Sequence, residues 1–289
     1  MKKVLVIGGS GFIGSAYSKE IQKRGFQVIN YDLPEHNILD EKDLLFKVKQ
    51  ADIVIHFAAM ANVVECFDMQ EETFNVNIRG VFNVARACCS EYKPLIFIST
   101  CCVYGNSLDD TEVEDKTCPQ AAEPYAVSKV AGEYILRGMP YLRYTILRIG
   151  TVYGPGMREA LFTYITLDRI LNEEKIFIDG DGSQSRQLVF IDDLVDGICL
   201  TTQKVEDLPN GLVINLCGTE KTSAMDTMQV SVEVIGKPAM YEHREQRYGQ
   251  TFHENISTDR ARQYLGWTPK TKFADGMLYT FKKDPRFRR

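Results

Sequence analysis

The sequence predicts an α/β protein with a Rossmann-type, doubly wound parallel sheet followed by a smaller C-terminal domain. A short apolar stretch at 4–7 runs straight into glycines spaced three apart, at Gly8, Gly11 and Gly14. Further apolar runs then alternate with stretches of helical spacing. Strands separated by helices pair in parallel and are covered on both faces. The alternation lapses after residue 152, which predicts where the second domain begins.

The predicted elements follow in chain order. Apolar runs typical of buried strands lie at 4–7, 27–31, 53–57, 95–99 and 144–148, with helical stretches at 74–89 and 125–136. We assign residues 1–152 to a dinucleotide-binding domain and residues 153–289 to a substrate domain. The segment 187–217 contains a strand feeding a helix and a further strand, and we expect it to return to the first domain.

Size and composition restrict the class of protein. The 289 residues are 44% hydrophobic, enough for one large α/β domain or for two domains with a cleft. A net charge of −5 argues against a nucleic-acid partner. Apolar runs fall short of the roughly 20 residues of a membrane span, and the N-terminus has no signal-peptide pattern. We therefore predict a cytoplasmic protein that binds neither membrane nor nucleic acid.

The eight cysteines show no C-x-x-C pair and no histidine spacing suited to zinc. We therefore predict reduced thiols and no metal site.

The glycine-rich turn predicts a dinucleotide site. Gly8 permits a tight turn, Gly11 lets the backbone approach a phosphate, and Gly14 lets the following helix pack close to its strand. The amides at the start of that helix then face the anion. Asp32 ends the second predicted strand, where a carboxylate accepts hydrogen bonds from ribose hydroxyls. Because that carboxylate repels a 2′-phosphate and no arginine follows it, we predict NAD rather than NADP.

A second motif, PYAVSK, places Tyr125 and Lys129 four residues apart on one helix face. An ammonium beside a phenol stabilises the phenolate, which lowers the tyrosine pKa from about 10. Tyr125 is then a candidate to take and return a hydroxyl proton. We expect Lys129 also to hold the nicotinamide ribose.

With these residues the chain resembles the extended short-chain dehydrogenase/reductases, in the group of nucleotide-sugar epimerases and dehydratases. The resemblance covers nearly the whole chain, in order. The matching stretches are GGSGFIGS, Asp32, HFAA at 56–59, NIRG at 77–80, STCCVYG at 99–105, PYAVSK, YGPG at 153–156, RQLVFIDD from Arg186, and LGWTP at 265–269.

The resemblance implies roles for individual residues. Thr100 matches the family's serine or threonine that hydrogen-bonds the reacting sugar hydroxyl, and with Tyr125 and Lys129 it completes the predicted catalytic set. Asn77 matches an asparagine that positions the active-site helix. The full set expected at the NAD site is Gly8, Gly11, Phe12, Ile13, Gly14, Asp32, Asn37, Ile38, Ala58, Ala59, Asn77, Ser99, Tyr125 and Lys129.

The residues after Thr100 bear on the reaction. Family dehydratases carry Asp and Glu there, whereas this chain has Cys101 and Cys102, and a thiol is a poor acid for expelling hydroxide. Cys102 falls where GDP-mannose 3,5-epimerases carry a catalytic cysteine, but their partner lysine is missing from REAL at 158–161. A decarboxylase would need an acidic group near Cys102 that the neighbouring sequence does not supply.

The remaining reaction is reversible oxidation of a sugar carbinol. We predict an NAD-dependent nucleotide-sugar epimerase acting at carbon 4 through a transient 4-keto intermediate. A nucleotide-sugar 4-dehydrogenase or a 4-keto-sugar reductase would use the same residues, and a non-catalytic NAD-binding module is the alternative from another class.

The expected substrate side comprises Thr100, Cys101, Cys102, Thr151, Arg186 and Arg247. The resemblance implies that Arg186 contacts the substrate diphosphate, and Arg247 resembles a second such contact; each could form a forked bond to phosphate. Arg186 could instead pair with Asp192 or Asp193. Thr151 stands where many relatives have asparagine, which leaves the identity of the sugar open. Relatives commonly dimerise through the helices corresponding to 74–89 and 125–136, so we expect a homodimer.

Overall fold

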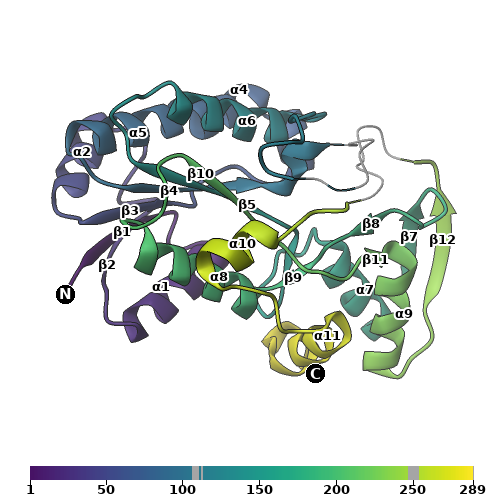
Figure 1. Ribbon diagram of the computed structural model, residues 1–289. Helices are drawn as coiled ribbons and strands as arrows, with labels where there is room; N and C mark the ends of the chain where they lie inside the picture. The colour runs from purple at the N-terminus through teal and green to yellow at the C-terminus, as the bar shows by residue number, and fades with distance from the viewer. Residues whose placement is uncertain (106–110, 112, 247–253, 289) are drawn as a thin grey trace.

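The computed structural model describes residues 1–105, 111, 113–246 and 254–288. Its centre is a parallel six-stranded sheet with strand order β10-β5-β4-β3-β1-β2 (Figure 1). The predicted fold class is therefore confirmed. The strands are β1 (Lys3–Ile7), β2 (Gln27–Tyr31), β3 (Ile53–His56), β4 (Leu95–Thr100), β5 (Tyr144–Ile149) and β10 (Leu212–Leu216).

Helices cover both faces of this sheet. On one face lie α1 (Phe12–Lys23) and α8 (Ile191–Lys204), and on the other lie α2 (Glu41–Lys49), α5 (Gly80–Ser90) and α6 (Pro124–Arg137) (Figure 1). Successive residues of β1 alternate between the two cores: Val4 and Val6 pack on the α1/α8 side, Leu5 and Ile7 on the other. This double burial explains why the strands appear in the sequence as continuous apolar runs.

The helix predicted at 74–89 differs in one respect. It is built from α4 (Gln70–Phe74), a π-helical turn η1 (Asn75–Arg79) and then α5, preceded by the short helix α3 (Val63–Asp68). The π-helical turn contains Asn77, whose side-chain amide bonds both backbone groups of Met60 at 2.9 Å. The predicted regular helix is therefore interrupted by a π-helical turn, and Asn77 in that turn bonds the backbone of Met60.

Most of the rest of the chain forms short strand pairs and helices at the carboxyl-end side of the sheet, whereas α10 (Asp259–Leu265) packs on α8 and β10 (Figure 1). The pairs are β6 (Val152–Tyr153) with β9 (Val189–Phe190), β8 (Ser185–Arg186) with β11 (Thr222–Ser223), and β7 (Lys175–Asp179) with β12 (Met240–Arg244). The helices are α7 (Phe162–Leu171), α9 (Ala224–Ile235), α10 and α11 (Phe273–Lys283), and the 3₁₀ turn η3 (Pro285–Phe287) follows. Segment 187–217 spans the two regions, since α8 packs on α1 and β10 joins the central sheet.

Candidate active site

The glycine-rich turn has the shape expected of a phosphate cradle. Gly8 has a φ of +84°, and a Cβ there would lie 2.5 Å from the backbone nitrogen of Ala58. A Cβ on Gly14 would lie 2.2 Å from the Gly8 carbonyl oxygen. Around Gly11 the nearest atom would be 3.5 Å away, and no side chain caps the start of α1. The turn is therefore closed on its protein side while the first-turn amides of α1 remain open to an anion.

Asp32 lies beside this turn. One carboxylate oxygen accepts a hydrogen bond from the Ser10 backbone amide at 2.8 Å, and the other from the amide of Leu33 at 2.9 Å. Asn37 is exposed and its side chain caps the Leu39 amide, whereas Ile38 is buried under Gly80. Of Asp32, Asn37 and Ile38, Asp32 is thus the residue whose side chain bonds the glycine-rich turn.

The remaining cofactor-side candidates contribute mainly packing and internal bonds. Phe12 and Ile13 pack against the α1/α8 core, Ala58 packs against the opposite core, and Ala59 is half-buried. The Asn77 amide also donates to the Ser128 hydroxyl of α6 at 3.0 Å. Together with the bonds to Met60, that bond connects α6 to the segment after β3.

Helix α6 carries the predicted catalytic pair at its start. It begins at Pro124, and the Glu123 carboxylate caps it by accepting from the amides of Tyr125 and Ala126, both at 2.8 Å. The Thr100 side chain at the end of β4 lies close enough to the Tyr125 phenol to lower its pKa. The Lys129 amine lies 5.9 Å from the centre of the Tyr125 ring. Thr100, Tyr125 and Lys129 therefore come together at the carboxyl end of the sheet.

The electrostatics of the pair differ from the sequence prediction. Burial raises the pKa of Tyr125 well above its usual value, with the neighbouring Cys102 adding to the effect. The expectation of an acidified tyrosine is therefore wrong for this structure. Burial is the largest cause, and the Lys129 amine, which donates to the Ile98 carbonyl at 2.9 Å, does not offset it. Burial also lowers the pKa of Lys129, to about 8, against an opposing effect of Glu133.

A buried ion pair, formed by Glu133 and Arg148, lies close to Lys129. Arg148 of β5 binds both carboxylate oxygens of Glu133, at 2.9 and 2.7 Å, and the two side chains are 1% and 2% exposed. The Ser99 hydroxyl donates to the same carboxylate at 2.7 Å. Ser99, predicted at the cofactor, therefore has its hydroxyl committed to this pair, which fixes β4, β5 and α6 relative to one another.

His56 at the end of β3 has no role predicted from the sequence. It is fully buried, and within the described part of the chain neither ring nitrogen has a hydrogen-bond partner. Burial, with a smaller contribution from the nearby Lys129, lowers its pKa to about 3. The ring is therefore neutral at physiological pH.

The two cysteines after Thr100 face different surroundings. Cys101 is buried, and its thiol contacts the Arg148 carbonyl at 3.4 Å, so the structure places it in the core rather than among substrate contacts. Cys102 is half-buried beside Thr100, whose hydroxyl oxygen accepts its backbone amide at 3.2 Å. Burial and then Glu254 raise the pKa of Cys102 to about 11. The thiol is thus protonated at neutral pH, which argues against a proton-abstracting cysteine.

Arg186 does not pair with Asp192 or Asp193. Its Nε lies 3.4 Å from the Glu254 carboxylate, while the carboxylate of Asp193 accepts from the amides of Lys270 and Thr271. Sequence reasoning missed Glu254, because no local motif marks an acid so far along the chain. Glu254 is also an acidic group close to Cys102, although the sequence next to Cys102 supplies none. Thr151 is half-buried with its carbonyl bonded to Val189, and Arg247 lies outside the described residues.

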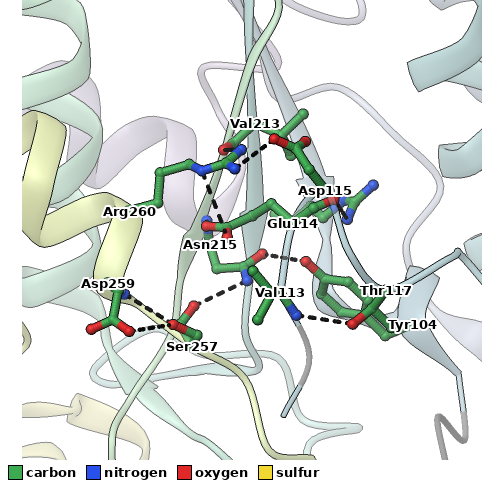
Figure 2. Close-up of polar contacts among 11 residues, drawn as sticks. Tyr104, Val113, Glu114, Asp115, Thr117, Val213, Asn215, Ser257, Asp259 and Arg260 are labelled. Atoms are coloured by element: carbon green, nitrogen blue, oxygen red, sulfur yellow. Dashed lines mark hydrogen bonds and ion pairs between the residues drawn. The ribbon is translucent and has the colours of Figure 1, made fainter. Parts of the chain in front are cut away.

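Described residues between β4 and α6 contact β10 and α10 (Figure 2). The Glu114 carboxylate accepts from the Asn215 amide at 2.9 Å, and the Tyr104 hydroxyl donates to the Asn215 side chain at 2.8 Å. Arg260 of α10 donates to the Val213 carbonyl at 3.0 Å and pairs with Asp115. Contacts from β10 and α10 therefore hold Tyr104, Glu114 and Asp115, which lie between Thr100 and Tyr125 in the chain.

Comparison with known proteins now decides the family. The NAD dependent epimerase/dehydratase family matches residues 4–217. The chain belongs to this family. NAD is accordingly the cofactor of this epimerase/dehydratase, and the cradle at Gly8 to Gly14 fits its pyrophosphate. Among the described residues, no helix of this family member is both long and apolar enough to cross a membrane.

Similar proteins include three 4-epimerases. UDP-glucose 4-epimerase of Mycolicibacterium smegmatis is 28% identical over 307 residues, which cover 96% of this chain and 97% of the relative. The structure of UDP-glucose 4-epimerase of Thermotoga maritima with UDP-glucose has a TM-score of 0.90 at 26% identity and covers 97% of both chains. The UDP-glucuronic acid 4-epimerase of Bacillus cereus, with UDP-glucuronic acid and NAD, has a TM-score of 0.90 at 25% identity, covering 97% of this chain and 98% of that one.

Proposed function

We propose that this chain is an NAD-dependent nucleotide-sugar epimerase that inverts carbon 4 of the sugar through a 4-keto intermediate. The observation that carries the proposal is the grouping of three side chains at the end of β4 and the start of α6: Thr100 lies close enough to the Tyr125 phenol to lower its pKa, and the Lys129 amine lies 5.9 Å from the centre of the same ring. The similarity to three 4-epimerases over almost the whole chain supports it.

The proposed mechanism assigns one task to each side chain. Tyr125 takes the proton of the carbon-4 hydroxyl and later returns it, while Thr100 orients that oxygen by a hydrogen bond. Lys129, with a pKa of about 8, is mostly protonated at pH 7 and favours the phenolate as Tyr125 loses its proton. NAD, when bound, supplies reversible hydride acceptance. Because Tyr125 acts only on the oxygen, it protonates the alkoxide of either configuration.

The cofactor and substrate would occupy opposite sides of this set. The turn from Gly8 to Gly14 and Asp32 would hold NAD. Residues 153–289 would provide most of the substrate side, where Arg186 offers a guanidinium to a nucleotide diphosphate. UDP-sugars are the first candidates, because two of the similar structures contain them.

The decisive experiment separates the reactions that share these residues. The purified protein is denatured to measure released NAD, and the native protein is incubated with UDP-, dTDP-, GDP- and CDP-sugars without added cofactor. Epimerised product with no net change in NADH absorbance supports the proposal. A stoichiometric rise in NADH would instead identify a dehydrogenase, and turnover only with added NADH would identify a keto-reductase.

A matched pair of variants excludes a non-catalytic NAD-binding module. Tyr125→Phe removes the proton carrier and is expected to reduce turnover by about 100-fold or more while leaving NAD bound. Tyr141→Phe, at an exposed tyrosine just beyond the same helix, is the control and should retain full activity. Equal turnover in both variants would contradict the assignment of Tyr125.

The assembly and location are proposed as a cytoplasmic homodimer. Phe82 on α5 and Val127 and Tyr134 on α6 are exposed although they are apolar or aromatic, which suits a helical interface between two copies. All eight cysteines are free thiols, as expected in a reducing compartment. Sedimentation of a monomer with full activity would contradict the dimer.

A further inference from the structure

Glu254 is a buried carboxylate with no part in the mechanism above. Glu254 is 4% exposed and lies just before α10 in the chain. Its main partners are Arg186, which ends β8, and Gln187, which follows β8. One oxygen lies 3.4 Å from Nε of Arg186, and the other accepts the Gln187 amide at 3.0 Å. A charge in such a place requires compensation, because desolvating it is costly.

The carboxylate is itself held firmly. The side chain of Gln187 donates to the carbonyls of Gly218 and Ile256, at 2.8 and 3.2 Å, and accepts the Ile256 amide. These bonds fix the backbone on both sides of the contact, at 187 and at 256. Glu254 therefore presents its charge to Arg186 from a rigid support.

Arg186 is held on one side and open on the other. Its Nη1 donates to the Ser185 carbonyl at 2.8 Å and its Nε faces Glu254, while no described residue accepts from its Nη2. A quarter of the side chain is exposed. Among the described residues the remaining donor edge has no acceptor, and a guanidinium fixed in advance loses less conformational entropy when it binds an anion.

We infer that Glu254 is a positioning residue that orients Arg186 toward the diphosphate of the nucleotide sugar, an inference that rests on the proposed function. Two effects of the carboxylate oppose each other. It fixes the guanidinium, which favours binding, and its negative charge repels the diphosphate. With Arg186 present, the pairing neutralises the charge and the orienting effect dominates. Without Arg186, only the repulsion remains.

A double-mutant cycle on the NAD-loaded enzyme tests this sign change, with UDP as the probe in calorimetric titration. Glu254→Gln keeps an acceptor for the Gln187 amide and is expected to weaken UDP binding about five- to tenfold. The same change in an Arg186→Met background should strengthen UDP binding relative to Arg186→Met alone. Glu254→Asp should fall between wild type and Glu254→Gln. Glu245→Gln, an exposed acid in the preceding segment, is the matched control and should bind as wild type does.

The outcomes separate this inference from the function on which it rests. Unchanged or tighter UDP binding by Glu254→Gln, or the same loss in both backgrounds, would overturn the role of Glu254 and leave the epimerase proposal intact. Failure of wild type to bind UDP or any other nucleoside diphosphate would overturn both. NAD content and thermal unfolding identify any variant that does not fold, and in that case Glu254→Asp carries the same comparison.

Discussion

Two acid–arginine pairs flank the proposed site, and they are built differently. Glu133 and Arg148 are fully enclosed and joined by two hydrogen bonds, at 2.9 and 2.7 Å. Glu254 and Arg186 meet through a single 3.4 Å contact, and the arginine is a quarter exposed. An arginine with its fork fully occupied fixes a fold, whereas one held on a single side can still bind a ligand. The difference between the pairs therefore separates the framework of the site from its substrate side.

The largest effect should come from breaking the enclosed pair. Glu133→Gln leaves Arg148 with an uncompensated buried charge, and we expect unfolding free energy to fall by about 3–5 kcal/mol. Glu254→Gln should cost about 1 kcal/mol or less, since solvent reaches Arg186. Urea unfolding followed by circular dichroism measures both. Similar losses in the two variants would remove the contrast between the pairs.

A smaller effect is expected on the cofactor side of the framework. Gly14→Ala would place a Cβ 2.2 Å from a backbone oxygen, so α1 must shift, at a cost of about 1–3 kcal/mol in stability and with loss of bound NAD. Gly138→Ala is the control, because its nearest contacts would be 3.5 Å away and its φ is −75°. NAD released on denaturation, measured against protein concentration, reports the difference. Retention of NAD by Gly14→Ala at the wild-type level would show that the cradle tolerates movement.

The smallest effect is expected in the pH dependence of turnover. This prediction concerns Lys129, whose pKa is raised by Glu133 of the enclosed pair against the effect of burial. With a pKa of about 8, Lys129 loses its proton as pH rises through that value, so turnover should fall about tenfold by pH 9. Lys129→Arg keeps the charge and should remove this alkaline decline, whatever its rate at pH 7. A decline of the same shape in both would assign it to another group.

As pH rises, the free energy of unfolding should change in the opposite direction to turnover. An unfolded lysine keeps its proton to about pH 10.4, so between about pH 8 and 10.4 the unfolded chain binds more protons than the folded one. The contribution of Lys129 to unfolding free energy should therefore rise with pH across that interval. Lys129→Met removes this contribution, and urea unfolding of the two proteins at pH 8 and pH 10 measures it.

The sequence by itself determined the parts of the site whose residues are close along the chain. The glycine turn, Asp32 at the end of the second strand and the spacing of Tyr125 and Lys129 depend on local backbone geometry, and the parallel sheet follows from strand and helix alternation. The family resemblance added Thr100 and Arg186 to that set.

Only the tertiary structure decided the environment of those residues. It brought Glu254 to Arg186, buried His56 with no hydrogen-bond partner among the described residues, directed Cys101 into the core and turned the Lys129 amine to the Ile98 carbonyl. Burial, not the neighbouring ammonium, then set the pKa of Tyr125. The physical reason is that desolvation and charge pairing depend on every group packed around a side chain, and most of those groups lie far away in the sequence.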